Sequence, residues 1–370
     1  MDPSTQFCPN CYCLHRGKAG LGNIRVPSRK ERRFRCPTGD KTFAATKNTP
    51  YYRLHKSLDL VTIVLTLLGH GCPRQAIVAA YGLDERTVAD WQQRAGRHSQ
   101  RFQELHVQQG RVDVQHVQAD ELWVKVLGRR LWMAMALAVP SRLWLGGVVS
   151  RHRDGKLIAA VVRLVRSCAS NLAILVCVDG LASYVTAFVK GFRHKLPRNG
   201  CGGRPRLLVE PGLLIGQVIK RYRGRQVAEV TRRVVRGRAE AIAAVLTGTG
   251  TGINTAYIER LNATFRSRWT PLVRRGRALV RERSVEAGMW LGGCAYNFCW
   301  EHDSLRVAAA PAESGRQWVG RTPAMAAGLT ARRWEWREVL GERQPPGRWK
   351  APRRKPRRRR TTPLTPRLAP

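Results

Sequence analysis

The hydrophobic periodicity of the chain changes near residue 111, and this change is the strongest constraint on its fold. Three strand-like runs separated by turn signals come first: residues 112–128, 129–140 and 142–150. A helix-like run, a nearly continuous apolar run ending in an acid, and a second helix-like run follow: residues 153–170, 171–180 and 183–192. This order of elements predicts an α/β fold with a mixed sheet.

Two helical patterns precede the sheet, at residues 54–71 and 72–100. In the second, Pro73 is typical of a helix start, Gly82 of a helix end and Asp84 of the cap of a following helix, whose Val88 and Trp91 would turn inward. The pattern predicts a helix-turn-helix, in which four side chains would face a DNA groove: Arg86, Thr87, Asp90 and Arg94. Two ordinary packed helices with a glycine turn are the alternative.

The first segment, residues 8–43, has the outline of a zinc ribbon. Cys8 and Cys11 form one knuckle and Cys36 opens a second, but Gly39 stands where a fourth cysteine is expected. Either Cys13 or His15 could substitute for the missing ligand. A ribbon that has lost its zinc, or binds it weakly, is the alternative.

The charge of the chain favours nucleic acid as a partner. Its 66 Lys and Arg residues against 25 Asp and Glu residues give a formal net charge of +41, which attracts a polyanion over long range. A membrane surface or a ribosome would also attract such a charge. The Arg- and Pro-rich end, residues 346–370, is too poor in apolar side chains to fold alone, and we expect it to be disordered and to bind polyphosphates.

Neither a membrane span nor a secretion signal is expected. The longest apolar stretch, residues 131–149, is interrupted by Pro140, Ser141 and Arg142, and the first residues lack a basic-then-apolar signal pattern. Seven of the ten cysteines are scattered, typically in apolar runs, where a free thiol behaves as a small hydrophobe. These features predict a protein of the reducing cytoplasm.

Two aspartates stand at the ends of predicted strands. Asp120 follows an alternating run and Asp179 ends a nearly continuous apolar one. An unpaired carboxylate in such surroundings is costly unless the strand end opens into a cleft where a cation neutralises it. Glu121, next to Asp120, should point to the opposite face of the sheet and therefore ranks below it.

A third carboxylate, Glu259, belongs to a predicted helix. Its apolar stripe is made of Ile258, Leu261, Phe265 and Trp269. Glu259 lies at the margin of this stripe, so the helix would hold it near the sheet without sealing it inside. Alone, each signal is weak, because a strand-end Asp is usually a turn cap and a Glu beside an Arg is usually a solvated pair.

Together, the three carboxylates suit hard divalent cations. Phosphoryl transfer by two metal ions about 3.5–4 Å apart needs carboxylates from separate elements to hold both ions. Asp120, Asp179 and Glu259 would supply such a set.

Four segments resemble the signature blocks of bacterial insertion-sequence transposases of the DDE type, in their usual order: DELWVKV (120–126), VDGLASY (178–184), NTAYIERLN (254–262) and YNFCWEHDSLR (296–306). The preceding ribbon and helix-turn-helix also resemble that family, so the likeness covers roughly residues 8 to 340. The resemblance implies a ribonuclease H-like core, which agrees with the order of strands and helices.

The resemblance also implies a reaction. Asp120 would bridge two Mg²⁺ (or Mn²⁺) ions, with Asp179 binding one and Glu259 the other. The activity would be hydrolytic nicking at the ends of an element, followed by attack of the freed 3′-hydroxyl on target DNA. The implied partner is double-stranded DNA, bound by a homo-oligomer in a bacterial, nucleoid-associated location.

The expected domains are a ribbon at 1–48, a helix-turn-helix at 49–108, a catalytic core at 109–306, an extension at 307–345 and a tail at 346–370. Further DNA contacts are predicted near Glu259, although a solvated helix face is the alternative for the arginines among them: Arg260, Asn262, Arg266, Arg274 and Arg275. A catalytically inactive DNA-binding remnant or repressor is the alternative function. A basic structural or RNA-binding protein would leave the carboxylates unexplained.

Overall fold

The computed structural model describes residues 2–126, 129–196, 204–224, 226–248, 252–269, 272, 281–309 and 317–347. The chain divides into two compact units, Met1–Asn48 with the chain from Pro345 onward, and Thr49–Gln344. Arg274, Arg275 and most of the predicted tail lie outside the described residues.

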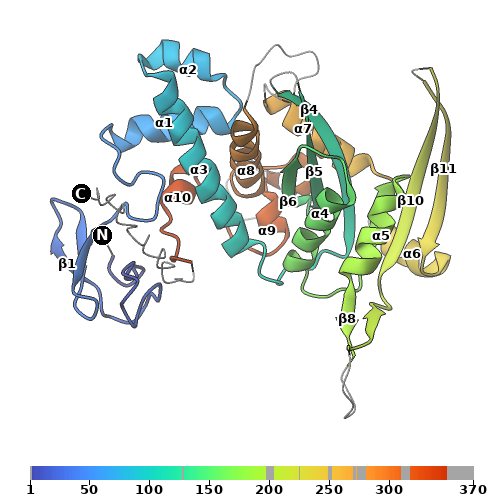
Figure 1. Cartoon of the computed structure of the whole chain (residues 1–370), viewed down its shortest axis with the longest axis horizontal. Helices are drawn as coiled ribbons and strands as arrows, with labels where there is room; N and C mark the ends of the chain where they lie inside the picture. The colour runs from blue at the N-terminus through green and yellow to red at the C-terminus, as the bar shows by residue number, and fades with distance from the viewer. Residues whose placement is uncertain are drawn as a thin grey trace, which may run out of the picture. The chain divides into compact units, whose positions relative to one another are not determined.

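A six-stranded mixed sheet forms the centre of the second unit (Figure 1), as the sequence predicted. Its order is β11-β10-β7-β4-β5-β6. The strands are β4 (His116–Val126), β5 (Arg129–Ala138), β6 (Leu143–Ser150), β7 (Leu175–Asp179), β10 (Leu214–Arg223) and β11 (Gln226–Arg236). β4, β5 and β6 are antiparallel neighbours, whereas β7 runs parallel to both β4 and β10. β10 and β11 pair as an antiparallel hairpin.

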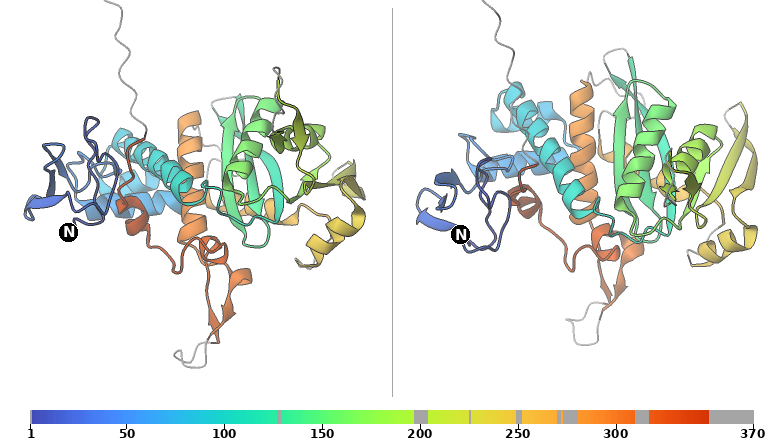
Figure 2. Two further views of the ribbon diagram at one scale, coloured as in Figure 1. Left: turned by 90° about the horizontal axis from the view of Figure 1, so that it is seen from below. Right: turned by 60° about the horizontal axis from the view of Figure 1, so that its bottom comes forward.

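Helices cover both faces of the sheet, which explains why β5 is apolar on both sides. On one face, α4 (Gly155–Cys168) and α5 (Ala182–Gly191) pack against alternate strand residues such as Val117 and Ala136. On the other face, α7 (Ala256–Arg268) and α8 (Glu282–Phe298) pack against Leu122 and Met135. Figure 2 shows α4 and α8 on either side of the strands.

Three helices precede the sheet: α1 (Leu58–Gly69), α2 (Arg74–Tyr81) and α3 (Glu85–His106). The predicted end of α2 and start of α3 are confirmed. Gly82 adopts a left-handed conformation with φ of 58°, and Asp84 accepts a hydrogen bond from the Thr87 N–H. Val88 and Trp91 are buried as expected. α3 continues well beyond the predicted motif and packs against α8, so this helix belongs to the core of the unit.

A buried asparagine joins α8 to the rest of this core. Asn297 accepts a hydrogen bond from the Trp144 N–H at 2.9 Å and donates to the Trp144 carbonyl at 2.8 Å and to Gln103 Oε1 at 3.2 Å. Its polar atoms thereby satisfy the backbone of β6 and a side chain of α3 at once. Part of the block at 296–306 is therefore architectural.

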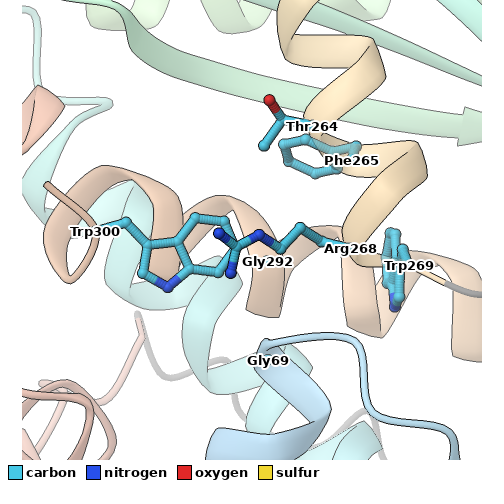
Figure 3. A pocket seen from close by; sticks show the side chains of 7 residues that line it. All are labelled: Gly69, Thr264, Phe265, Arg268, Trp269, Gly292 and Trp300. Atoms are coloured by element: carbon cyan, nitrogen blue, oxygen red, sulfur yellow. The ribbon is translucent and has the colours of Figure 1, made fainter. Parts of the chain in front are cut away.

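Glycines on α8 let large aromatic side chains approach the helix. A Cβ at Gly288 would overlap the Trp269 indole, and one at Gly293 would overlap Trp144. Trp269 thereby anchors the carboxyl end of α7. Figure 3 shows this region, where the Arg268 guanidinium lies 4.5 Å from the centre of the Trp300 ring. The cavity there encloses about 10 Å³, the space of a single water molecule, so it is a packing gap.

The first unit contains a three-stranded antiparallel sheet of β1 (Arg25–Ser28), β2 (Arg33–Cys36) and β3 (Lys41–Ala44). Its core is small and consists of thiols and three larger apolar side chains, Ile24, Phe34 and Phe43. A core of this size benefits from a bound metal or another cross-link.

The remaining elements are short: β8 (Arg193–Lys195), β9 (Leu207–Val209), α6 (Ala239–Thr247), η2 (Asp303–Leu305), β12 (Val307–Ala308), β13 (Trp318–Val319), α9 (Pro323–Ala326) and α10 (Trp336–Gly341). β8 and β9 pair as a short antiparallel ladder. Within the described ranges, every helix is too short or too polar to cross a bilayer.

Candidate active site

The parallel pairing of β4 and β7 places Asp120 and Asp179 side by side. Asp179 ends β7 as predicted, whereas Asp120 lies within β4, which continues to Val126 beside β5. Gln118 pairs with Cys177 in this register, and two residues further along each strand come Asp120 and Asp179. The side chains of parallel neighbours at the same level point to the same face of the sheet. Asp120 thus comes just after the point where β4 stops pairing with β7, and this register explains why the two acids meet.

A cavity of about 660 Å³ brings the three predicted acids together. Asp120 and Asp179 line it from the sheet, and Glu259 lines it from α7. Basic and amide side chains complete its polar lining: Arg153, Lys220, Asn262 and Arg266. The cavity therefore combines carboxylates that suit a cation with positive groups that suit an anion.

Asp120 is half-buried and is held from two sides. Its Oδ1 accepts the Glu121 N–H at 2.8 Å, and its Oδ2 accepts the Asn262 amide at 2.7 Å. Burial, followed by the neighbouring charges of Glu121 and Asp179, raises the pKa of Asp120 to about 7. A cation in the cavity would relieve this cost, because it would favour the ionised carboxylate.

Asp179 has a similar environment. Its Oδ1 accepts the Leu181 N–H at 3.0 Å, the local turn bond typical of an Asp at a strand end. Burial nevertheless raises the pKa of Asp179 above its ordinary value, in spite of that bond and of the Arg153 and Lys220 charges. The turn-cap role and the cluster role therefore coexist in one residue.

Glu259 lies at the margin of the apolar stripe, as predicted, with 48% of its side chain exposed. Its Oε1 accepts hydrogen bonds from Lys220 Nζ at 2.5 Å and from Thr255 Oγ1 at 2.8 Å. Among the described residues, the acidic cluster tight enough to hold an ion contains Asp120, Glu121 and Asp179, with ligand atoms within 4.8 Å of one another. Glu259 is outside that group, and its carboxylate forms an ion pair with Lys220.

Glu121 is the member of this cluster that the sequence ranked low. Its side chain is only 1% exposed, and it accepts a hydrogen bond from the buried Tyr184 hydroxyl at 2.7 Å. The side chain is thus on the α5 side, as strand alternation predicted, yet its carboxylate still reaches the aspartates. Glu121 Oε1 also accepts a hydrogen bond from Arg153 Nε at 2.5 Å. This bond holds the guanidinium at the wall of the cavity.

Gln118 positions the helix that carries Glu259. Its Oε1 accepts the N–H groups of Tyr257 and Ile258, both at 3.0 Å, and its Nε2 donates to the Asn254 carbonyl at 2.8 Å. The fully buried Gln118 therefore caps the amino end of α7 from the adjacent strand. Sequence reasoning missed this residue, although a glutamine among buried strand positions was a signal.

Asn262, a predicted DNA contact, lies at the wall of this cavity. It is 2% exposed and donates its amide to Asp120. Its Oδ1 is buried without a partner among the described residues and belongs to a side chain that lines the cavity. An orphaned amide oxygen beside carboxylates is a further donor that suits a hard cation.

The other predicted DNA contacts differ in their surroundings. Arg260 is exposed and Arg266 lines the cavity. On α3, Arg86 is exposed and Thr87 is half-buried. Asp90 and Arg94 form an ion pair at 2.6 Å, and Arg94 also donates to the Tyr52 carbonyl, so both have partners within the protein.

A second cluster, of thiols, lies in the first unit. The Sγ atoms of Cys8, Cys13 and Cys36 are within 4.8 Å of one another and all three residues are buried. Cys13, named only as a substitute, takes the place expected for Cys11, which is half-buried and outside the cluster. Gly39 does stand at the vacant ligand position, because a Cβ there would lie 3.1 Å from Cys8 Sγ and 3.2 Å from Cys13 Sγ.

No protein-family model matches this chain, and neither does any curated protein.

Proposed function

We propose that the protein is a DNA transposase of the DDE type, which cuts and joins the ends of an insertion sequence by phosphoryl transfer. The observation that carries this proposal is the convergence of Asp120, Asp179 and Glu259 on one cavity, from two parallel strands and a later helix. The three antiparallel strands, the parallel β7 and the helices between them support a ribonuclease H-like core.

The residues present fit divalent cations of the Mg²⁺ or Mn²⁺ type. Asp120, Glu121 and Asp179 offer carboxylate oxygens, and the orphaned Oδ1 of Asn262 offers an amide oxygen. Glu259 would join them once its ion pair with Lys220 opens. The chemistry that two such ions supply is polarisation of the attacking and leaving oxygens of a phosphodiester.

The protein's own groups orient the substrate. Arg153, held by the buried Glu121, presents its guanidinium to the cavity, where it would contact a phosphate. Lys220, which also lines the cavity, would supply a second positive charge once it is freed from Glu259. Neither a serine nor a tyrosine nucleophile is required, because water and then a DNA 3′-hydroxyl are the attacking groups.

In the first unit, we propose that Cys8, Cys13 and Cys36 hold zinc as a structural ion. Three buried thiols around one point are the donor set that this ion prefers. The role would be to stabilise a unit whose apolar core is small.

The test of the main proposal is cleavage and joining of labelled DNA taken from both flanks of the gene, with Mg²⁺. Replacing Glu259 with Gln should lower strand cleavage by at least about a thousandfold, since it removes one ion's ligand, while DNA binding is retained. Glu286→Gln, an exposed α8 position outside the cavity, is the matched control. Equal activity in the wild type and Glu259→Gln would refute the catalytic assignment.

Wild-type binding to these ends without any metal-dependent cleavage would favour the inactive repressor. The Lys220–Glu259 pair would then be a permanent replacement for the cation.

A further inference from the structure

A second cavity, of about 850 Å³, lies where the end of the β4–β5 hairpin, the end of β6 and the start of α8 meet. We call it the basic groove. Its charged lining consists of five arginines and one acid: Arg129, Arg130, Arg151, Arg281, Arg283 and Glu282. None of these residues belongs to the carboxylate cavity, and no sequence motif pointed to them.

Most of this positive charge is uncompensated. Arg151 donates to Glu282 at 2.7 Å, and within the described ranges this is the groove's only ion pair. All five arginines are exposed. The groove also includes the amino terminus of α8, a helix of 17 residues whose dipole adds to the positive potential there. Like charges collected in a concave surface focus the field on a polyanionic partner.

One loop connects the basic groove to the carboxylate cavity. In the segment between β6 and α4, Arg151 and His152 line the groove, whereas Arg153 lines the cavity. The Cα atoms of Arg151 and Arg153 are at most about 7.6 Å apart, since each trans peptide spans about 3.8 Å. Phosphates follow one another every ~3.4 Å of helix axis along one DNA strand. A single strand of about two or three nucleotides can therefore contact both arginines.

We propose that the basic groove binds the sugar–phosphate backbone of duplex DNA and leads one strand into the carboxylate cavity. This inference rests on the proposed function and deepens it, because it assigns the surface along which the DNA approaches the acids. The arginines contact phosphates, so the groove contributes affinity that is independent of base sequence.

The experiment measures affinity for a labelled DNA duplex by fluorescence anisotropy, in Ca²⁺ to prevent cleavage, over a range of salt concentrations. The double variant Arg129→Gln/Arg283→Gln should bind roughly a hundredfold more weakly at about 0.1 M salt, about tenfold for each phosphate contact. The slope of log affinity against log salt should fall by roughly 1.8, because each lost contact contributes ~0.9.

Two matched variants make the result decisive. Arg163→Gln/Arg238→Gln removes two exposed arginines outside both cavities and should leave affinity within about twofold. Arg129→Lys/Arg283→Lys keeps the charge and should restore most of the affinity. An equal loss in the control pair, or no loss in the groove variant with its melting temperature unchanged, would overturn the inference.

The same variants separate other partners and separate this inference from the proposed function. If the groove variant lost binding to phosphatidylserine vesicles or to single-stranded RNA but not to duplex DNA, the assignment to DNA would be wrong. If the wild type bound DNA through the groove but did not cut it with Mg²⁺, the transposase proposal would fail while the groove assignment stood.

Discussion

The two clusters of possible metal ligands differ in how they meet solvent. Cys8, Cys13 and Cys36 are all buried in the small core of their unit, whereas the carboxylates of Asp120 and Asp179 are half-buried at a cavity of about 660 Å³. An ion held by these three buried thiols is enclosed in the core and cannot reach a substrate, so its role would be to stabilise the fold. An ion at an open carboxylate cluster can exchange water for substrate, which is what catalysis requires.

Both clusters are nevertheless costly in the absence of a cation. Burial raises the pKa of the Cys8 thiol to about 12, and burial with neighbouring acids raises the pKa of Asp120 to about 7. In each case the environment disfavours the ionised form that would bind a metal, and a cation would reverse this. In both clusters, a cation would therefore stabilise the ionised ligands. The clusters differ in the softness of those ligands and in how far solvent reaches them.

The thiol cluster can be tested by completing it. We expect Gly39→Cys to tighten zinc binding on the order of a hundredfold, because a fourth thiolate would complete the tetrahedral set. A Cβ added at this position would lie 3.1 Å from Cys8 Sγ, and the Gly39 N–H donates to Cys36 Sγ at 3.3 Å, so the new thiol would start beside the cluster. The measurement is competition with a chromophoric chelator.

Gly39→Ser is the control, because it adds a side chain of similar size with a much weaker ligand. If serine and cysteine changed zinc affinity equally, the gain would come from packing. The cluster would then not be the zinc site.

The carboxylate cluster can be tested by pH. Because the pKa of Asp120 is about 7, the residue is protonated below this value and cannot bind a cation. We expect Mn²⁺ affinity, followed by paramagnetic resonance, to fall about tenfold for each pH unit below 7, the dependence for one proton released. If the Mn²⁺ affinity stayed constant between about pH 5 and pH 7, Asp120 would not be a ligand of the cation.

In the absence of metal, the contribution of Asp120 to the free energy of unfolding should fall as the pH rises, whereas its contribution to Mn²⁺ affinity should grow. The folded pKa of about 7 exceeds the ordinary value of 3.8, so the protonated carboxyl stabilises the native state at low pH, and this contribution is lost as pH rises through 7. Asp120→Asn mimics the protonated form. Without metal it should raise the melting temperature at pH 8, and the gain should shrink as the pH approaches 4.

The two clusters also show which parts of a site could be predicted from the sequence and which could not. Hydrophobic periodicity predicted the strands and helices and placed Asp179 correctly at the end of β7, but its prediction that Asp120 stands at a strand end was wrong, because β4 continues to Val126. The reach of Glu121 toward the aspartates, the cap from Gln118 and the bond from Asn262 depend on contacts between elements far apart in the chain. Periodicity within one element contains no information about such contacts.

The prediction of which cysteines form the thiol cluster was wrong for a more local reason. The spacing of Cys8 and Cys11 indicated a knuckle, but the turn after Cys8 places Cys13 at the centre instead. Spacing in the chain predicts ligands only when the backbone of the turn follows the usual path. Here, Asn10 donates its side-chain amide to the Gly39 carbonyl at 2.9 Å, which ties this turn to the opposite knuckle.

The smallest predicted effect concerns the ion pair between Lys220 and Glu259. We expect Lys220→Met to tighten Mn²⁺ binding about threefold, because the released carboxylate becomes available as a ligand. The gain is limited, since the two side chains are 32% and 48% exposed and solvent screens their interaction. The measurement is again a Mn²⁺ titration.

Lys125→Met is the matched control, because it removes an exposed lysine from β4 that does not line the cavity. The double variant Lys220→Met/Glu259→Gln provides the sharper comparison. If the gain arises from freeing Glu259, it should disappear in the double variant. If the gain persists there, it reflects only the loss of a positive charge near the cavity, and Glu259 would not be a ligand.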